Sequence, residues 1–231
     1  MKTMGILGGV GPQATMDFER RVHHAAQRLI PQHGNRGYPP MVVYYHRRPP
    51  FVMRDDRTPM LPLEPDPDLL RAAQWLGTRA DFLVITANGP HALQAQIEHA
   101  TGCHVLSMIA VTLQDVQRRG WQKVGVLGFG DPIVSIYTRP MRQFALTYET
   151  IESALCVKLD EAIWALIEGR ASAQATACAR EAIVALRAKQ VDGIILGCTE
   201  IPLLLGQDAE APDLVNPAEV LAESAVRHAL T

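Results

Sequence analysis

Short apolar runs alternate with segments of helical periodicity along most of this chain. The apolar runs, rich in aliphatic and β-branched residues, predict strands at 4–8, 41–45, 82–86, 104–109, 123–128 and 192–197. Between several of them, apolar positions at helical spacing predict helices at about 12–30, 66–78, 90–101, 111–120, 158–168 and 172–189. Nearly continuous apolar strands that alternate with amphipathic helices are typical of a parallel sheet covered on both faces, and so of the α/β fold class. The proline-rich stretch 49–67 instead predicts a long surface loop, either a functional lid or simple padding.

Two motifs occur twice, in the same order. The run Gly5-Ile-Leu-Gly-Gly-Val-Gly-Pro12 is echoed 120 residues later by 125–132, and the run 81–88 is echoed 111 residues later by 192–199. Nearly equal separations favour a duplicated half-domain over strand–turn–helix units that look alike because the same physics shapes them. Ligands of open α/β sheets bind outside the carboxyl ends of the strands, so we expect the active site in a cleft between the halves. The walls of this cleft would be residues 8–9, 86–91, 128–132 and 197–200.

Composition argues against several classes of function. The net charge is −2 and the pI is near 6.4, so nothing electrostatic favours a nucleic-acid or membrane partner. No apolar run approaches the roughly 20 residues that span a bilayer, and Met1 leads directly into a strand pattern rather than a signal peptide. We therefore expect a cytoplasmic protein. The four cysteines form no CxxC pair, which indicates free thiols.

The glycine-rich turn after the first predicted strand has two interpretations. The run Gly9-Val-Gly-Pro-Gln-Ala14 fits the G-x-G-x-x-A fingerprint of dinucleotide-binding folds. Arg47 and Arg48, after the second strand, would suit the 2′-phosphate of NADP. Against an NADP-binding oxidoreductase, Pro12 stands where a helix tolerates proline, so the glycines can simply shape a tight turn. We consider the dinucleotide interpretation the weaker one.

Cys198 is the strongest candidate for a reactive group. It follows a predicted strand, between Gly197 and Thr199, where backbone N–H groups and a helix dipole are expected to lower its pKa. The alternative is a buried and inert thiol, which is how most free cysteines occur. Cys156 and Cys178 are expected to pack in or beside helices.

Two histidine-containing segments leave alternatives open. His91 stands in the first half at the position that matches the Cys198 segment, and it could be a general acid or base or could cap and pack. Cys103 lies beside His99 and His104 in the sequence, but short Cys/His clusters are more often incidental, and we expect no metal.

Together these residues resemble the aspartate/glutamate racemase superfamily. The similarity rests on the run Gly5–Thr15, on Asn88 with His91, and most specifically on Leu196-Gly-Cys-Thr-Glu-Ile-Pro-Leu203. The stretch Asp56-Arg57-Thr58 also looks like the family's substrate-carboxylate loop. The resemblance extends over most of the chain.

The resemblance implies a fold, a chemistry and a set of site residues. The fold would be two pseudo-symmetric Rossmann-like domains, 1–108 with 214–231 and 109–213, each a mostly parallel sheet flanked by helices. The protein would be a cofactor-independent isomerase, often a homodimer, acting at the α-carbon of an acidic amino acid or related carboxylate. One thiolate would remove the α-proton and an opposed thiol would return one from the other face. The substrate-binding residues would be Gly9, Arg57, Asn88, Gly89, Thr199 and Glu200.

The chain departs from the family at the first of the two cysteine positions, where it has Ala87. Gly89 replaces the threonine that usually follows the family's asparagine. Phe129 and Pro132 stand where substrate-contacting threonines are expected. A methyl group cannot shuttle a proton, and strand alternation aims the adjacent Thr86 at the opposite face. The symmetrical two-thiol mechanism is therefore not open to this chain.

Three functions remain. The first is a racemase-type isomerase, with Cys198 opposed by His91 or a water, or with an inactivating substitution at position 87. The second is a lyase that resembles arylmalonate decarboxylase of the same superfamily, in which one cysteine protonates a carbanion from one face. The third is a non-catalytic carboxylate binder. We favour the first, and the apolar residues Phe129 and Pro132 argue for a substrate other than plain aspartate.

Overall fold

The computed structural model describes residues 1–55, 58–128 and 130–231, and of residues 130–135 it describes the backbone alone. The chain forms two compact units. Unit 1 comprises Met1–Met108 with Leu221–Thr231, and unit 2 comprises Ile109–Val220. In the described part of the chain, no helix is both long and apolar enough to cross a membrane.

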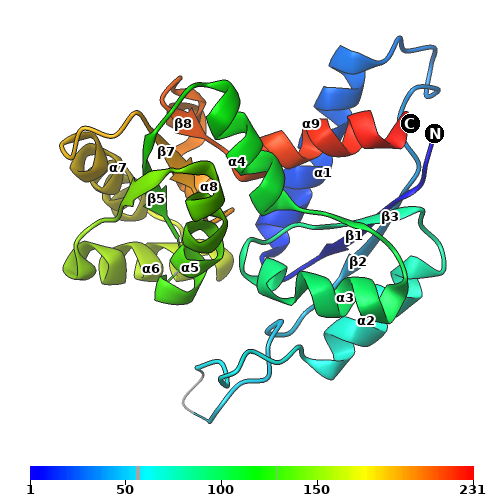
Figure 1. Cartoon of the computed structure of the whole chain (residues 1–231), viewed down its shortest axis with the longest axis horizontal. Coiled ribbons are helices and arrows are strands. Elements are labelled where there is room, and N and C mark those ends of the chain that lie inside the picture. The colour runs from blue at the N-terminus through cyan, green and yellow to red at the C-terminus, as the bar shows by residue number, and fades with distance from the viewer. Residues whose placement is uncertain (56–57, 129) are drawn as a thin grey trace. The chain divides into compact units, whose positions relative to one another are not determined.

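Unit 1 is built on a four-stranded parallel sheet in the order β2-β1-β3-β4. Its strands are β1 (Met4–Gly8), β2 (Met41–Tyr45), β3 (Phe82–Ile85) and β4 (Val105–Leu106). Its helices are α1 (Pro12–Leu29), α2 (Pro67–Gly77), the 3₁₀ helix η1 (Gly89–Leu93), α3 (Gln94–Thr101) and most of α9 (Pro217–Ala229). Helices α1 and α9 lie on one side of the sheet, and α2 and α3 lie on the other (Figure 1).

Local sequence explains how these elements begin. Every residue of β1 and β3 is buried, as expected for central strands of a sheet covered on both faces. Helix α1 opens with Pro12 at its first turn, where the missing N–H costs nothing. Helix α2 is capped by Asp66, whose carboxylate accepts hydrogen bonds from the backbone N–H groups of Asp68 and Leu69.

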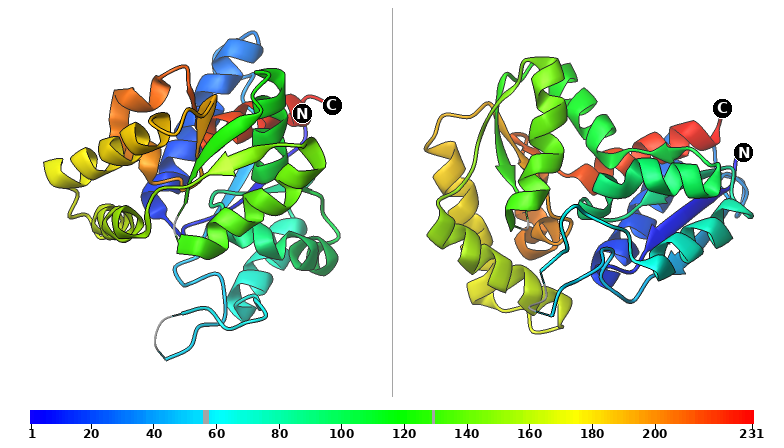
Figure 2. Two further views of the ribbon diagram at one scale, coloured as in Figure 1. Left: turned by 60° about the vertical axis from the view of Figure 1, so that its left-hand side comes forward. Right: turned by 60° about the horizontal axis from the view of Figure 1, so that its bottom comes forward.

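Unit 2 repeats the same topology. Its strands are β5 (Lys123–Leu127), β6 (Thr147–Glu149), β7 (Gly193–Leu196) and β8 (Leu214–Val215), all parallel, in the order β6-β5-β7-β8. Its helices are α4 (Met108–Arg118), α5 (Gly130–Met141), η2 (Arg142–Phe144), α6 (Ser153–Ile167), α7 (Ala173–Arg187), α8 (Ile201–Leu205) and η3 (Gly206–Glu210). Figure 2 shows the elements of this unit from two further sides. The strand order of unit 1 recurs position by position in unit 2, which confirms the predicted α/β fold with two related halves.

Alternating strand residues of unit 2 build two separate cores. Leu127 and Leu196 face the cluster formed by α6, α7 and α8, which also contains Cys198. Val126 and Ile195 face the cluster formed with α4 and α5. The alternation follows from the pleat of a strand, which directs successive side chains to opposite faces of the sheet. Cys198 therefore belongs to the α6–α7–α8 side of the sheet.

Several predicted boundaries were wrong. The predicted strand 104–109 is only β4, because α4 already begins at Met108, and an apolar run alone does not separate a strand from a buried helix start. Helix α6 begins at Ser153, five residues before the predicted start. Strands β6 and β8 were not predicted: β6 is exposed and polar, and β8 has two residues.

The proline-rich stretch contains no helix or strand among its described residues before α2. Its two arms pair through isolated bridges, Phe51 with Pro65 and Met53 with Pro59. The backbone N–H of Met60 donates to the carbonyl of Val52 at 2.9 Å, which adds to this pairing. The segment is thus a long loop whose arms are held together by backbone hydrogen bonds.

Candidate active site

The carboxyl end of β7 carries the residues of the predicted thiol site. Cys198, Thr199 and Glu200 follow the strand directly, and α8 begins at the next residue. Gly197 precedes them because a Cβ atom there would lie 2.6 Å from the carbonyl oxygen of Leu127, the last residue of β5. Glycine therefore lets the two strands end close together.

The three polar side chains of this segment converge on one carboxylate oxygen. The thiol of Cys198 donates a hydrogen bond to Glu200 Oε2 at a donor–acceptor distance of 3.1 Å, and the hydroxyl of Thr199 donates to the same oxygen at 3.1 Å. All three residues are at most 6% exposed. The segment thus holds a buried thiol against a buried carboxylate.

Burial controls the protonation of this pair. Loss of solvent raises the pKa of Cys198 well above its ordinary value, and the charge of Glu200 raises it further. Burial also raises the pKa of the Glu200 carboxyl. The expectation that the strand end would lower the pKa of Cys198 is therefore wrong. The helix that follows, α8, has only five residues, so its dipole does not offset desolvation and a neighbouring carboxylate.

In unit 1, the corresponding strand ends meet in a buried hydroxyl network. Thr15 Oγ1 accepts the N–H of Gly9 at 2.8 Å and donates to the carbonyl of Gly11 at 3.1 Å. It also lies 2.8 Å from Thr86 Oγ1. Either hydroxyl can donate the hydrogen bond between Thr15 and Thr86. The Thr86 hydroxyl is thus engaged inside unit 1 rather than serving as a substitute base.

The glycines after β1 are required by packing within the protein. Gly9 has a φ of +87°, and a Cβ atom there would lie 2.6 Å from the backbone nitrogen of His46. At Gly8, a Cβ atom would lie 2.5 Å from the methyl group of Thr15. These contacts account for the glycines without a nucleotide and favour the tight-turn interpretation over the NADP fingerprint.

The segment after β3 places Ala87 and His91 together. His91 Nδ1 lies 2.9 Å from the carbonyl oxygen of Ala87, and His91 Nε2 accepts the N–H of Met108 at 3.0 Å. These partners fix the neutral tautomer with its proton on Nδ1. Burial lowers the pKa of His91 to about 4. Both ring nitrogens are hydrogen-bonded to backbone groups, which supports a packing role for His91 over an acid–base role.

The structure describes only some of the remaining predicted site residues. Ala87 and Gly89 are half-buried, and Asn88 is buried. Arg57 and Phe129 lie outside the described residues, and so does the side chain of Pro132.

Other candidate features do not join this site. Within the described ranges, no group of three histidine, cysteine, aspartate or glutamate side chains could hold a metal ion. The thiol of Cys103 lies 3.5 Å from the carbonyl of Gly77, to which it donates. Cys178 is buried in the α7 core, as predicted for a packing residue, and Cys156 is half-buried on α6.

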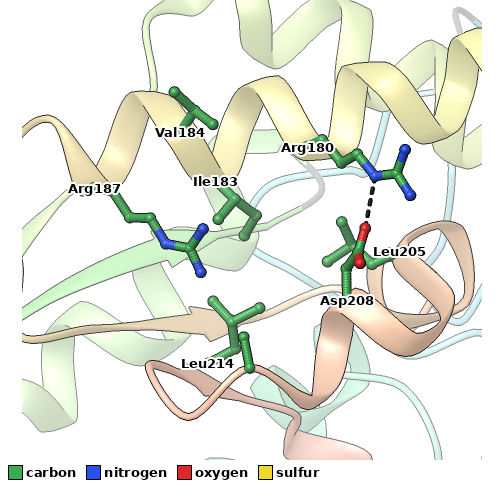
Figure 3. Close-up of a pocket in the computed structure, with 8 residues that line it drawn as sticks. Arg180, Ile183, Val184, Arg187, Leu205, Asp208 and Leu214 are labelled. Atoms are coloured by element: carbon green, nitrogen blue, oxygen red, sulfur yellow. Dashed lines mark hydrogen bonds and ion pairs between the residues drawn. The ribbon is translucent and has the colours of Figure 1, made fainter.

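A groove of about 320 Å³ lies on the surface of unit 2, between α7 and the segment from α8 to β8 (Figure 3). Ile183 and Leu214 contribute to its apolar walls, and Arg180 pairs with Asp208 across it at 2.6 Å. Cys198 does not line this groove. The groove is therefore distinct from the thiol site.

The two repeated parallel sheets and the buried thiol at a strand end place this chain in a class of two-unit α/β proteins. Residues 7–225 match the Asp/Glu/Hydantoin racemase family, and the chain belongs to that family. The chain is 24% identical over 225 residues to the broad specificity amino-acid racemase RacX of Bacillus subtilis (strain 168), covering 96% of each chain. The predicted resemblance is thereby confirmed.

Two solved structures have a similar fold. The chain aligns with an aspartate racemase homologue of Pyrococcus horikoshii OT3 at a TM-score of 0.76 and 20% identity, over all of both chains. It aligns with the aspartate racemase of Picrophilus torridus at a TM-score of 0.79 and 21% identity, over 99% of this chain and 94% of that one.

Proposed function

We propose that this protein is a cofactor-independent racemase-type isomerase that exchanges the α-proton of an amino acid or related carboxylate. Membership of the racemase family supports the class of reaction. The observation that carries the proposal is the buried hydrogen bond from the Cys198 thiol to Glu200. One segment thus provides a thiol that can transfer a proton, Cys198, and a carboxylate that can accept the thiol's own proton, Glu200.

The proposed reaction begins with the proton of the thiol. Cys198 transfers it to Glu200, whose raised pKa makes the carboxylate a better acceptor than an exposed one. The thiolate then removes the α-proton, forming an S–H bond as the C–H bond breaks. The electron pair of that bond is left on the α-carbon and is delocalised into the substrate's carboxylate. Arg57 and the backbone groups around Gly9, Asn88 and Gly89 are proposed to bind the substrate carboxylate, and Thr199 to hold Glu200 in place.

Position 87 makes the proposed reaction one-sided. The resemblance pairs this position with Cys198 as the second proton carrier, and alanine has no exchangeable proton. Return of a proton by Cys198 itself gives exchange with retention of configuration. Inversion needs a proton from water on the opposite face, and we expect it to be slower than exchange.

The reaction is tested by NMR in D2O with a panel of L- and D-amino acids and aryl-substituted malonates. The proposal predicts deuterium at the α-carbon of at least one amino acid, with inversion slower than exchange. Release of CO2 from a malonate without amino-acid exchange would indicate a lyase. Binding without either reaction would indicate a carboxylate binder. Both of these results would overturn the proposal.

A further inference from the structure

Strand β2 forms one edge of the unit 1 sheet, with β1 as its hydrogen-bonded neighbour. The backbone N–H of Met4 donates to the carbonyl of Pro40, and the backbone N–H of His46 donates to the carbonyl of Gly8. Even-numbered residues of this segment therefore direct their backbone groups towards β1, and the odd-numbered residues between them direct theirs away from it. These outward N–H and C=O groups have no hydrogen-bond partner in the described part of the chain, and they belong to Met41, Val43 and Tyr45.

The other sheet edges of the described chain are protected against pairing with a further strand. Strands β4 and β8 have two residues each. Strand β6 has three and carries Glu149, which pairs with Lys123 at 3.3 Å. Strand β2 has five residues, Met41-Val-Val-Tyr-Tyr45, and contains neither a charge nor a proline. Because edges that stay in water are commonly kept short, charged or interrupted by proline, β2 has the character of an edge that is covered.

An aromatic patch lies beside this edge on the side of α2. The side chains of Tyr44 and Trp75 are 38% and 43% exposed, and their ring centroids are 6.1 Å apart. The guanidinium of Arg79 lies over the Trp75 ring, 4.2 Å from its centroid. Tyrosine, tryptophan and arginine are the residues enriched at protein interfaces and among their energetically dominant contacts. The surroundings of β2 therefore favour another protein chain as the group that covers it.

The edge of β2 is complementary to itself in antiparallel pairing. When Val43 lies opposite Val43 of a second copy, Met41 lies opposite Tyr45, so the outward residues form three hydrogen-bonded pairs. Each pair exchanges two hydrogen bonds, which gives about six in all. The same register places Tyr44 opposite Val42 of the second copy, and aromatic–β-branched pairs are favourable cross-strand contacts. Since β2 contains no charged residue, the pairing of the two strands brings no like charges together.

We propose that β2 is the interface of a homodimer, in which the β2 strands of two copies pair antiparallel across a two-fold axis at Val43. Such a contact uses the same surface on both copies, so it closes on itself as a dimer instead of extending into a fibre. It joins the two unit 1 sheets into one continuous sheet and brings the second copy against the patch of Tyr44 and Trp75. The interface belongs to unit 1 and does not depend on the proposed function.

The first test uses the unmodified protein. Light scattering after size exclusion is expected to give twice the chain mass of 25.4 kDa. Amide hydrogen exchange of the same sample is then read at single residues by mass spectrometry. The N–H of Val43 should exchange at least about tenfold more slowly than in an unstructured chain, as the N–H of Val42 does through its bond to β1. A monomer at every concentration, or a dimer in which the Val43 N–H is unprotected, overturns the proposal.

The second test exploits the position of Val43 opposite its own copy. Val43→Lys and Val43→Glu each place like charges face to face, so each should raise the dissociation constant of the dimer by at least about 10²-fold. Mixing the two variants should restore dimers, because an ammonium then faces a carboxylate. Val184→Lys, at an exposed valine of α7, is the matched control and should leave the dimer unchanged. Urea unfolding checks that each variant folds. A folded Val43→Lys that stays dimeric, or a mixture that stays monomeric, overturns the proposed pairing.

Discussion

The thiol of Cys198 and the carboxylate of Glu200 share a hydrogen bond of 3.1 Å inside unit 2. The two groups are separated by one residue, Thr199, whose hydroxyl donates to the same carboxylate oxygen. This arrangement keeps the thiol protonated at rest, because burial and the adjacent negative charge both disfavour the thiolate. The same carboxylate can take up the thiol proton once a substrate is bound.

The first prediction concerns alkylation of the free protein. Cys198 is expected to react with iodoacetamide at neutral pH at least about tenfold more slowly than the half-buried Cys156, because the thiolate is the nucleophile and its formation at Cys198 is disfavoured. The rate at Cys198 should rise as the pH increases towards its raised pKa. Peptide mapping by mass spectrometry gives both rates. Faster labelling of Cys198 than of Cys156 at neutral pH would contradict the buried-thiol description.

The second prediction concerns Glu200→Gln. Removing the charge eases formation of the thiolate but also removes the acceptor for its proton. Alkylation of Cys198 should therefore become faster at a given pH, while kcat for α-proton exchange falls by about 10²–10⁴-fold. The exposed Glu210→Gln serves as the control and should change neither rate. If both rates of Glu200→Gln fall together, or neither moves, Glu200 does not have the assigned role.

The third prediction concerns His91 and acid stability. Its pKa is about 4 in the folded protein against 6.5 in the unfolded chain, so the folded state favours the neutral ring. This contribution to stability is fully present above pH 6.5 and is lost as the pH falls towards 4. Between pH about 7.5 and about 5, the free energy of unfolding is expected to fall by about 2 kcal/mol because of His91.

His91→Gln removes this titration. The variant should be less stable than the wild type at neutral pH by about 1–3 kcal/mol, since it weakens hydrogen bonds to buried backbone groups. Its stability should also fall less between the two pH values. Urea unfolding at both pH values measures the two effects. An equal acid-induced loss in both proteins would show that His91 is not held neutral by the fold.

The fourth prediction concerns Ala87→Cys. The family resemblance pairs this position with Cys198, so the substitution restores the second thiol. Racemisation of a substrate that already exchanges its α-proton should rise by about 10²-fold or more, since a positioned acid or base contributes about 10²–10⁴-fold. Circular dichroism with each enantiomer as starting material follows the reaction. Addition of Cys198→Ser in the same background should abolish it. A folded Ala87→Cys variant that exchanges but gains no inversion would mean that position 87 does not face the substrate.

The sequence predicts the long buried elements well and the short or exposed ones poorly. Apolar runs identify β1, β5 and β7, and the repeated motifs identify the two related halves. Strand β6 has no apolar pattern because it is an exposed edge strand, and β8 is too short to leave one.

The sequence likewise predicts some features of the candidate site and not others. The motif around Cys198 and Glu200 is contiguous, so the sequence alone points to it. The direction of the Cys198 pKa shift depends on how deeply the segment is packed, which no local pattern reveals. His91 was open to two interpretations until its hydrogen-bond partners were known.

The most direct test of the central claim compares α-proton exchange in Cys198→Ala and Cys178→Ala. Both substitutions remove a buried thiol of unit 2, but only Cys198 is proposed to carry the proton. Deuterium incorporation into the best amino-acid substrate is followed by NMR, with folding verified by urea unfolding. Cys178→Ala is expected to exchange at nearly the wild-type rate, and Cys198→Ala is expected to lose at least about 10²-fold. Exchange at the wild-type rate in folded Cys198→Ala would contradict the account.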